Sequence, residues 1–264
     1  MKIKKFLNNL NSNNQIVEND RIRHEFAMLR DYKSLGKTYT KKYDVKNLNT
    51  GEYWNTIFDN NETLADQSPM TKDKISIIAN LIPEGPKKIL DLGIGQGFLE
   101  EKLLALSKRH NCFGIDISAH AIKRAKGKFR GEFTTDSVHN IRNHYSKDSF
   151  DVIVAIELLE HINASAIFSL YKDVRSLLNK NGLLIISIPI NERLEKMNNN
   201  PSAHVRDYSQ ETIKAELVLN RFYVIQTFKL YAFKKTYRLK KFISKIMPHR
   251  WEPNSLIIVA RKKA

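Results

Sequence analysis

A glycine-rich turn near the middle of the chain limits its fold more than any other stretch. Residues 87–98 read KKILDLGIGQGF, which predicts a short apolar strand over 89–92, then a tight turn and a helix. Gly93, Gly95 and Gly97 have no side chains, so the backbone there can adopt left-handed dihedrals and approach a ligand closely. The first N–H groups of the helix face the same place. This arrangement is typical of a turn that binds a nucleotide-like cofactor.

Acidic residues near three successive strand ends indicate which kind of cofactor. A dinucleotide fingerprint has the spacing G-x-G-x-x-G, but this turn has G-x-G-x-G with Asp91 shortly before it. A carboxylate there suits a cationic ligand better than a pyrophosphate. Asp116 closes a second predicted strand, over 112–117, where an acid can accept both hydroxyls of a ribose. Asp136 follows a third, over 132–135. A turn that merely closes a βα unit would not explain these acids.

Short motifs, in order and at matching spacing, resemble those of the class I S-adenosylmethionine-dependent methyltransferases. They lie at 91–97, 114–118, 135–137, 149–161 and 181–189. Within that superfamily the sequence is similar to ubiquinone-pathway O-methyltransferases and to the general bacterial small-molecule branch. The resemblance implies S-adenosylmethionine as cofactor, with acids for its ammonium, ribose and adenine groups. The cofactor-binding residues it implies are Asp91, Gly93, Gly95, Gly97, Asp116, Ile117, Asp136, Ser137 and Glu157.

Strand-like and helix-like segments alternate along most of the chain, which predicts an α/β, doubly wound sheet. The run 150–158 is almost continuously apolar, as in a central parallel strand buried on both faces. Further strands are predicted over 183–188, 222–230 and 255–260, helices over 72–82, 119–126, 167–178 and 210–219, and an irregular link over 137–149. The resemblance implies a Rossmann-like, seven-stranded sheet that is mostly parallel with an antiparallel edge strand.

We expect two parts in the chain. A polar N-terminal segment, 1–70, is helical or irregular, and an S-adenosylmethionine-binding domain, 71–264, carries a basic insert at 231–254. In many small-molecule methyltransferases the N-terminal segment folds over cofactor and substrate. Aromatic residues that could form such a lid are Tyr39, Tyr43, Tyr53 and Trp54. The alternative is that they only attach the segment to the domain.

Composition limits the compartment and the partners. Among 264 residues there is one cysteine, Cys112, so an internal disulfide is excluded and a reducing cytosol fits. No apolar run reaches membrane-spanning length. We therefore expect a cytoplasmic protein, soluble or peripheral at a membrane. The net charge is +16, and residues 221–264 contain 12 Lys or Arg against one acid, Glu252. Such a field attracts phosphates of nucleic acid, anionic lipid or an anionic substrate.

The basic insert contains a helical pattern. Leu239, Phe242, Ile243, Ile246 and Met247 share one helical face, and basic residues fall away from it. A short basic amphipathic helix can lie on a membrane surface, bind a partner protein or pack on its own domain. The sequence leaves these three alternatives open.

A run of ionisable residues follows the fourth predicted strand. Glu157, Glu160 and His161 form E-x-x-E-H there, and His204 follows the fifth strand. If the chain turns helical after Glu157, the two acids share a face. Carboxylates with imidazoles suit a divalent ion such as Mg²⁺, Mn²⁺ or Zn²⁺, which can lower the pKa of an acceptor hydroxyl. The run resembles that of ubiquinone-pathway O-methyltransferases. With the later histidine it also resembles metal-dependent enzymes that methylate the 2′-hydroxyl at small-RNA 3′ ends.

Two alternatives to a metal site stay open. In the first, the acid at the strand end lines the cofactor pocket and the next histidine only packs. The residues after His204, VRDYS, look more like the bacterial small-molecule and glycan branch than the RNA branch. In the second, a histidine removes the hydroxyl proton as a general base. The catalytic candidates are therefore His161, His204 and Glu160.

Three functions are consistent with the sequence. The first is methyl transfer to a hydroxyl of a small-molecule, lipid-linked or glycan acceptor, with the polar loop 191–203 as a substrate-site candidate. The second is metal-assisted methylation of an RNA 2′-hydroxyl, favoured by the basic tail although no separate RNA-binding module is visible. The third is a cofactor-binding scaffold without catalysis, which the complete set of cofactor motifs disfavours.

Overall fold

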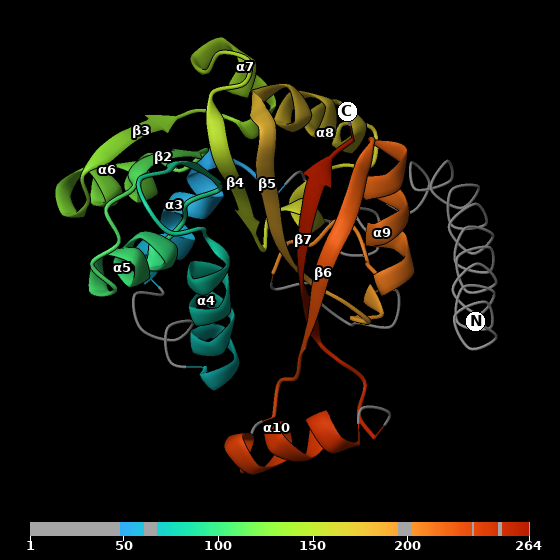
Figure 1. Ribbon diagram of the computed structural model, residues 1–264. Helices are drawn as coiled ribbons and strands as arrows, with labels where there is room; N and C mark the ends of the chain where they lie inside the picture. The colour runs from blue at the N-terminus through green and yellow to red at the C-terminus, as the bar shows by residue number, and fades with distance from the viewer. Residues whose placement is uncertain (1–47, 61–67, 195–201, 234, 248–249, 264) are drawn as a thin grey trace.

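The computed structural model describes residues 48–60, 68–194, 202–233, 235–247 and 250–263 (Figure 1). Within these ranges the strands are β1 Lys88–Leu92, β2 Asn111–Asp116, β3 Gly131–Thr135, β4 Phe150–Ile156, β5 Leu178–Pro189, β6 Phe222–Leu230 and β7 Ser255–Lys262. They form a seven-stranded sheet in the order β3-β2-β1-β4-β5-β7-β6. The strands β1 to β5 pair in parallel, and β7 lies antiparallel between β5 and β6. The predicted Rossmann-like sheet with an antiparallel edge is confirmed.

Helices cover both faces of this sheet, as Figure 1 shows. The α-helices are α3 Gly51–Asn60, α4 Pro69–Leu81, α5 Phe98–Ala105, α6 Ala119–Lys128, α7 Ile141–His144, α8 Ile167–Leu177, α9 Gln210–Leu219 and α10 Tyr237–Ile246, with 3-10 helices η2 Val138–Asn140 and η3 Leu159–His161. Neighbouring residues of a strand enter opposite faces. Val152 and Val154 pack with α4 and α5, while Ile153 packs with α8 and α9. The central strands are therefore apolar on both sides, as their sequence predicts.

Parallel pairing gathers the ends of β1 to β5 at one edge of the sheet. Leu92, Asp116, Thr135, Ile156 and Pro189 are the last residues of these strands. The segments that leave them carry the glycine turn and the predicted acids and histidines. Ligands of open α/β sheets bind at this carboxyl edge, so the fold alone brings the candidate residues to one place.

Two segments differ from the sequence prediction. Strand β5 begins at Leu178 rather than at 183, because Leu178 already pairs with Phe150 before a register shift. The Asn181-Gly182 pair, which resembles a helix stop, therefore lies inside the strand. The link predicted as irregular over 137–149 contains η2 and α7 instead. Ser137 starts that turn, because its hydroxyl accepts a hydrogen bond from the His139 N–H.

Parts of two predictions lie outside the described residues. The N-terminal lid aromatics Tyr39 and Tyr43 do so, and so does the stretch 195–201 of the predicted substrate loop. Among the helices that are described, none has the length and hydropathy needed to cross a membrane.

A buried ion pair holds the segment that follows the substrate loop. Arg206 and Glu216 are 2% and 0% exposed, and their Nη1 and Oε1 atoms lie 2.7 Å apart. The Tyr171 and Tyr208 hydroxyls each donate to Glu216 Oε2 at 3.1 Å. The pair fixes α9 to the chain just after His204, so a candidate site residue depends on it for position.

We predict that Arg206→Met destabilises the fold by about 3–5 kcal/mol, because it leaves the Glu216 carboxylate buried without its counter-charge. The double variant Arg206→Met, Glu216→Leu should recover at least half of this loss, since both charges are then gone. Urea unfolding of the three proteins measures the differences. Equal destabilisation of the single and double variants would contradict this account of the pair.

Candidate functional site

The glycine turn has the backbone conformation that its sequence predicts. The φ angles of Gly93, Gly95 and Gly97 are 72°, 51° and 74°, all in the left-handed region. A Cβ at Gly97 would lie 2.5 Å from the Phe129 ring. The turn is attached to the neighbouring strand, because the Gly93 N–H donates to the Ile115 carbonyl at 2.8 Å. At Gly97 a side chain is therefore excluded by both the dihedral and the lack of space.

Asp116 fixes the turn from the end of β2. Its carboxylate accepts the Gly95 N–H at 2.9 Å and the Ser118 N–H at 2.8 Å. Burial raises the pKa of Asp116, and the two N–H groups oppose that rise. A carboxylate has about four acceptor positions, so capacity remains for ligand hydroxyls. The next residue, Ile117, is 38% exposed and adds an apolar surface beside it.

Asp91 is a buried acid without a hydrogen-bond partner at one oxygen. It is 2% exposed, and Oδ1 contacts no donor among the described residues. Burial, followed by the charges of Glu100 and Asp116, raises its pKa well above the usual range. Glu100 is buried beside it, and burial raises its pKa to about 7. A group with positive charge would relieve this concentration of acids, so the site fits the cationic ligand expected from the sequence.

The single cysteine lies near the same acids, and its pKa depends mainly on burial. Burial, with Glu100 and Asp91 nearby, raises the pKa of the Cys112 thiol to about 12. The thiol is therefore protonated at neutral pH and a poor nucleophile.

Asp136 is already engaged by its own loop. Its Oδ1 accepts from the Ser137 N–H at 2.7 Å and from the Asn140 side chain at 2.8 Å. Its Oδ2 lies 2.7 Å from His144 Nε2. The hydrogen bond from His144 is the main reason that the pKa of Asp136 falls below its usual value. The loop therefore presents an ionised carboxylate at the third strand end.

Helix α3 covers the cofactor turn. The Asn55 Oδ1 accepts the Ser118 hydroxyl at 2.7 Å, and Asp59 pairs with His120 at 2.8 Å. A Cβ on Gly95 would lie 3.5 Å from the Phe58 ring. In the same helix, the Trp54 ring stacks on Phe58 and meets His161 edge-on, with centroids 5.0 Å apart. The predicted aromatic Trp54 thus lies between the turn and the E-x-x-E-H run.

Glu157 does not share a helical face with the other ionisable residues of its run. Its backbone has φ 50°, and the 3-10 helix η3 begins only at Leu159, so the expected helical face with Glu160 does not form. The Glu157 carboxylate pairs with Lys74 at 2.8 Å and accepts the Ser187 hydroxyl at 2.6 Å. Burial alone would raise its pKa, but the charge and hydrogen bond of Lys74 hold the pKa below the usual value.

Glu160, His161 and His204 form a compact cluster. One ligand atom from each lies within 4.8 Å of the other two. The Glu160 carboxylate is fully buried, and neither oxygen has a hydrogen-bond partner within the described chain. Backbone contacts close the cluster, because Val205 N–H donates to the Glu160 carbonyl at 2.9 Å. Of the four predicted metal ligands, the structure gathers three and leaves Glu157 outside the group.

The imidazoles of this cluster are oriented by neighbouring oxygens. His161 Nδ1 donates to the Ala203 carbonyl at 3.3 Å, and His204 Nδ1 lies 2.7 Å from the Glu192 carboxylate. Such contacts fix which ring nitrogen carries the proton. The other ring nitrogen of His204, Nε2, lies 3.9 Å from Glu160 Oε1. Burial, then the charge of His204, lowers the pKa of His161 to about 3. Burial and the charge of Glu157 raise the pKa of Glu160 well above its usual value.

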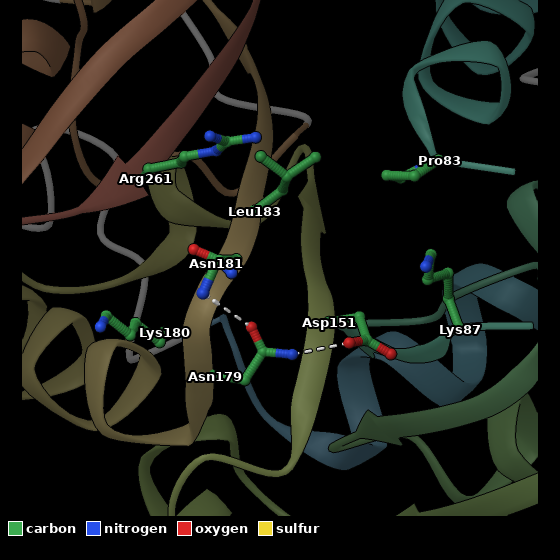
Figure 2. A pocket seen from close by; sticks show the side chains of 8 residues that line it. All are labelled: Pro83, Lys87, Asp151, Asn179, Lys180, Asn181, Leu183 and Arg261. Atoms are coloured by element: carbon green, nitrogen blue, oxygen red, sulfur yellow. Dashed lines mark hydrogen bonds between the residues drawn. The ribbon is translucent and has the colours of Figure 1, made fainter.

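A polar pocket of about 370 Å³ lies at the opposite, amino-terminal edge of the sheet (Figure 2). Its Asp151 accepts the Lys88 N–H at 2.9 Å and the Asn179 side chain at 2.6 Å. Figure 2 shows Asn179 also bonded to Asn181, whose N–H donates to it at 3.0 Å. These bonds join the starts of β1, β4 and β5, which indicates a structural role.

Several site residues were missed from the sequence. Lys74 is 4% exposed although it is charged, and the signal was its place one turn before Ile78 on the apolar face of its helix. Glu192 lies in the loop singled out for substrate, but nothing local pairs it with His204. Glu100 and Phe58 gave no signal that distinguishes them from ordinary helix residues.

A protein-family model described as a methyltransferase domain matches residues 67–227. An O-methyltransferase of ubiquinone biosynthesis from Pelagibacter ubique is 33% identical over 105 residues, which is 38% of this chain and 41% of that protein. A malonyl-[acyl-carrier protein] O-methyltransferase from Legionella pneumophila is 25% identical over 104 residues, or 39% and 36% of the two chains. The matches span about two fifths of the length of these relatives.

Solved structures share the fold at low sequence identity. The N-methyltransferase NodS of Bradyrhizobium japonicum, solved with S-adenosyl-L-homocysteine, superposes with a TM-score of 0.61 at 15% identity, covering 82% of this chain and 100% of NodS. A methyltransferase solved with the Trm112 activator of Haloferax volcanii gives a TM-score of 0.63 at 13% identity, with 81% and 98% covered.

We predict that Glu100→Gln stabilises the protein at high pH and changes little at low pH. The folded-state pKa, about 7, lies above the ordinary value of 4.5, so the wild type loses stability as pH rises through this interval. The full loss is about 3 kcal/mol, and the gain in the variant should approach it at pH 8. Thermal unfolding between pH 5 and 8 measures the gain. The exposed neighbour Glu101→Gln is the control, and a gain independent of pH would refute the prediction.

Proposed function

Because this chain belongs to the class I S-adenosylmethionine-dependent methyltransferases, we propose that it transfers a methyl group to a hydroxyl of a small-molecule, lipid-linked or glycan acceptor. The observation that carries the proposal is the Glu160–His161–His204 cluster, at the same sheet edge as the acids Asp91 and Asp116. A cofactor cradle thus adjoins groups that can activate a hydroxyl. Two relatives whose names specify O-methyl transfer support an oxygen acceptor.

The residues at the turn fit S-adenosylmethionine. We assign the unpartnered Asp91 oxygen to the ammonium side, with Gly93, Gly95 and Gly97 against the methionine and sugar. Asp116 takes the ribose hydroxyls with its remaining acceptor positions, and Ile117 packs on the adenine. Asp136 accepts a hydrogen bond from the adenine amino group, and Ser137 lies beside that group. Glu157, which Lys74 holds in place, lines the methionine end.

S-adenosylmethionine supplies a sulfonium methyl group, and its leaving group is a neutral thioether, so the protein mainly positions the acceptor and excludes water. We propose that α3, with the rest of segment 1–70, is a lid over domain 71–264 that positions the acceptor and excludes water. Support comes from Phe58 beside Gly95 and from Trp54 against His161. The basic insert 231–254 belongs to the same domain.

A hydroxyl acceptor must lose its proton. We propose that Glu160, His161 and His204 hold a divalent ion, with Glu192 orienting His204. A buried carboxylate whose oxygens accept no hydrogen bond among the described residues, and which lies 3.9 Å from the His204 ring, fits a cation. A cation would remove the cost of burying that acid. Two imidazoles favour Zn²⁺ or Mn²⁺ over Mg²⁺. A bound ion would lower the pKa of an acceptor hydroxyl.

A general base is the alternative for the same step. His204 with Glu192 forms a carboxylate–imidazole pair, 2.7 Å apart, that could accept the proton without a metal. His161 is a poor base, because burial lowers its pKa to about 3. Activity in chelator separates the two mechanisms.

An RNA hydroxyl is the second candidate acceptor. The three-residue cluster and the basic C-terminal region favour it, since Lys and Arg side chains neutralise phosphates. Methyl-transfer assays with hydroxylated quinol-type lipids, glycans and short RNAs distinguish the classes. Binding of S-adenosylmethionine without transfer to any of them would favour the scaffold alternative.

We predict that Asp116→Ala weakens binding of S-adenosylmethionine by about 1.5–3 kcal/mol, the scale of hydrogen bonds to a charged group. The loss has two sources, the ribose contacts and the unpaired Gly95 N–H. Isothermal titration measures the affinity, with Asp151→Asn at the opposite edge as control. Unchanged affinity in Asp116→Ala would overturn the ribose assignment.

For the metal, we predict that Zn²⁺ or Mn²⁺ raises the melting temperature of chelator-treated protein. Stabilisation is about 2.7 kcal/mol at a hundredfold excess over the dissociation constant. Glu160→Gln and His161→Ala should abolish the shift, whereas the exposed His139→Ala should keep it.

Methyl transfer should also fall in chelator and return with the ion. If no ion shifts the melting temperature and activity is full in chelator, the metal site is excluded and the general-base mechanism is favoured.

A further inference from the structure

Helix α10 is displaced from the body of the molecule. It joins β6 to β7, and Figure 1 shows it beyond the sheet, at the end of two connecting segments. The exposed apolar side chains in and directly after it are Leu239 at 59%, Phe242 at 62%, Ile246 at 65% and Met247 at 50%. The prediction of a helix in the insert is confirmed, but packing of its apolar face on its own domain is not what forms.

The opposite face of α10 is the one that holds it to the domain. Tyr237, Lys241 and Ser244 recur at helical spacing on this inner face, and Ser244 is buried. The Tyr237 hydroxyl donates to Asp73 of α4, and Lys241 pairs with the same carboxylate. The outward face is therefore set by these contacts, and its apolar side chains point away from the domain.

Aromatic rings support the base of the helix. Phe233 stacks on Tyr231 with ring centroids 5.5 Å apart, and meets Trp251 at 5.1 Å and Tyr237 at 6.4 Å. These contacts join the two connecting segments to each other and to α10. Packed aromatic rings, as well as the chain connections, therefore hold the base of α10 in place.

Basic side chains border the apolar face. On a helical projection, Arg238 and Lys245 lie along one border of that face and Lys240 lies along the other. Lys235 and Arg250 are exposed just outside the helix ends. Between 229 and 251 the sequence contains no Asp or Glu. An apolar centre between two basic borders is the pattern of a helix that lies in the plane of a membrane interface.

The helix also lies at the edge of the sheet that carries the candidate site. Pro189 at the end of β5 pairs with Ser255 at the start of β7, which in turn pairs with Leu230 at the end of β6. Both connections to α10 therefore leave from the carboxyl edge, where the glycine turn and the Glu160 cluster lie.

We propose that α10 docks this protein on the surface of an anionic lipid bilayer, with the carboxyl edge of the sheet toward the lipid. The basic borders meet the headgroups, and Leu239, Phe242 and Ile246 enter the acyl boundary. A second copy of the chain would bring the same positive charge and repel. Nucleic acid would use the basic residues but leave the apolar centre unmatched. The docking stands apart from the proposed reaction, although it would present the site to a lipid-borne acceptor.

The test is flotation of the full chain with vesicles, without cofactor or acceptor. We expect binding to phosphatidylcholine vesicles that contain about one third phosphatidylglycerol, and much weaker binding to phosphatidylcholine alone. Raising the salt to about 0.5 M should weaken it further, because salt screens the basic borders. The double variant Phe242→Ser, Ile246→Ser should bind about tenfold more weakly or worse, since both side chains are exposed and leave the core intact.

A charge variant tests the borders separately. Arg238→Gln, Lys240→Gln, Lys245→Gln should lose binding to anionic vesicles by about tenfold or more. Matched controls elsewhere on the surface should bind as the wild type does. They are Leu104→Ser, whose side chain is 66% exposed on α5, and the triple variant Lys123→Gln, Lys126→Gln, Arg130→Gln.

Titration with S-adenosylmethionine on the same preparations separates this proposal from the proposed function. Normal cofactor binding in both α10 variants shows that they fold, so loss of flotation in them alone supports docking. Equal partitioning to neutral and anionic vesicles, no partitioning at all, or equal loss in the controls would overturn it. So would vesicle binding that short RNA displaces fully and that the Phe242→Ser, Ile246→Ser variant retains.

Discussion

The carboxyl edge of this sheet depends on one buried carboxylate. Asp116 accepts N–H groups from Gly95 in the turn after β1 and from Ser118 at the start of α6. These bonds hold two separate connections in register, and the Gly95 donor has the left-handed backbone that glycine adopts without strain. Burying the Asp116 carboxylate costs free energy, and these two hydrogen bonds offset part of that cost. They also fix the orientation of the carboxylate, and therefore of its remaining lone pairs.

Sequence patterns identified the fold because each strand carries its own signal. The continuous apolar run of β4 is such a local feature, and the structure has it as a central strand buried on both faces. Parallel pairing then collects the strand ends without further information. Asp91, Asp116 and Glu160 could be placed at one edge for this reason, although they are far apart in the chain.

What the sequence could not supply are pairings between distant segments. Lys74 meets Glu157 and Glu192 meets His204, and neither partner carries a local mark of the other. The positive φ at Glu157 breaks the helical alignment with Glu160 that the sequence predicts. A non-glycine residue carries no sequence signal of positive φ, so this break could not be predicted. Strand β5 extends back to Leu178 through pairing with Phe150, which overrides the turn preference of Asn181-Gly182.

If α3 is the lid that we propose, cofactor exchange requires a conformational step. The helix touches the glycine turn through Phe58 and the histidine cluster through Trp54, while Asn55 and Asp59 clamp it to α6. A rigid movement of this lid away from the glycine turn would also move Trp54 away from His161. Under that proposal, opening of the lid would limit how long spent cofactor and methylated product stay bound.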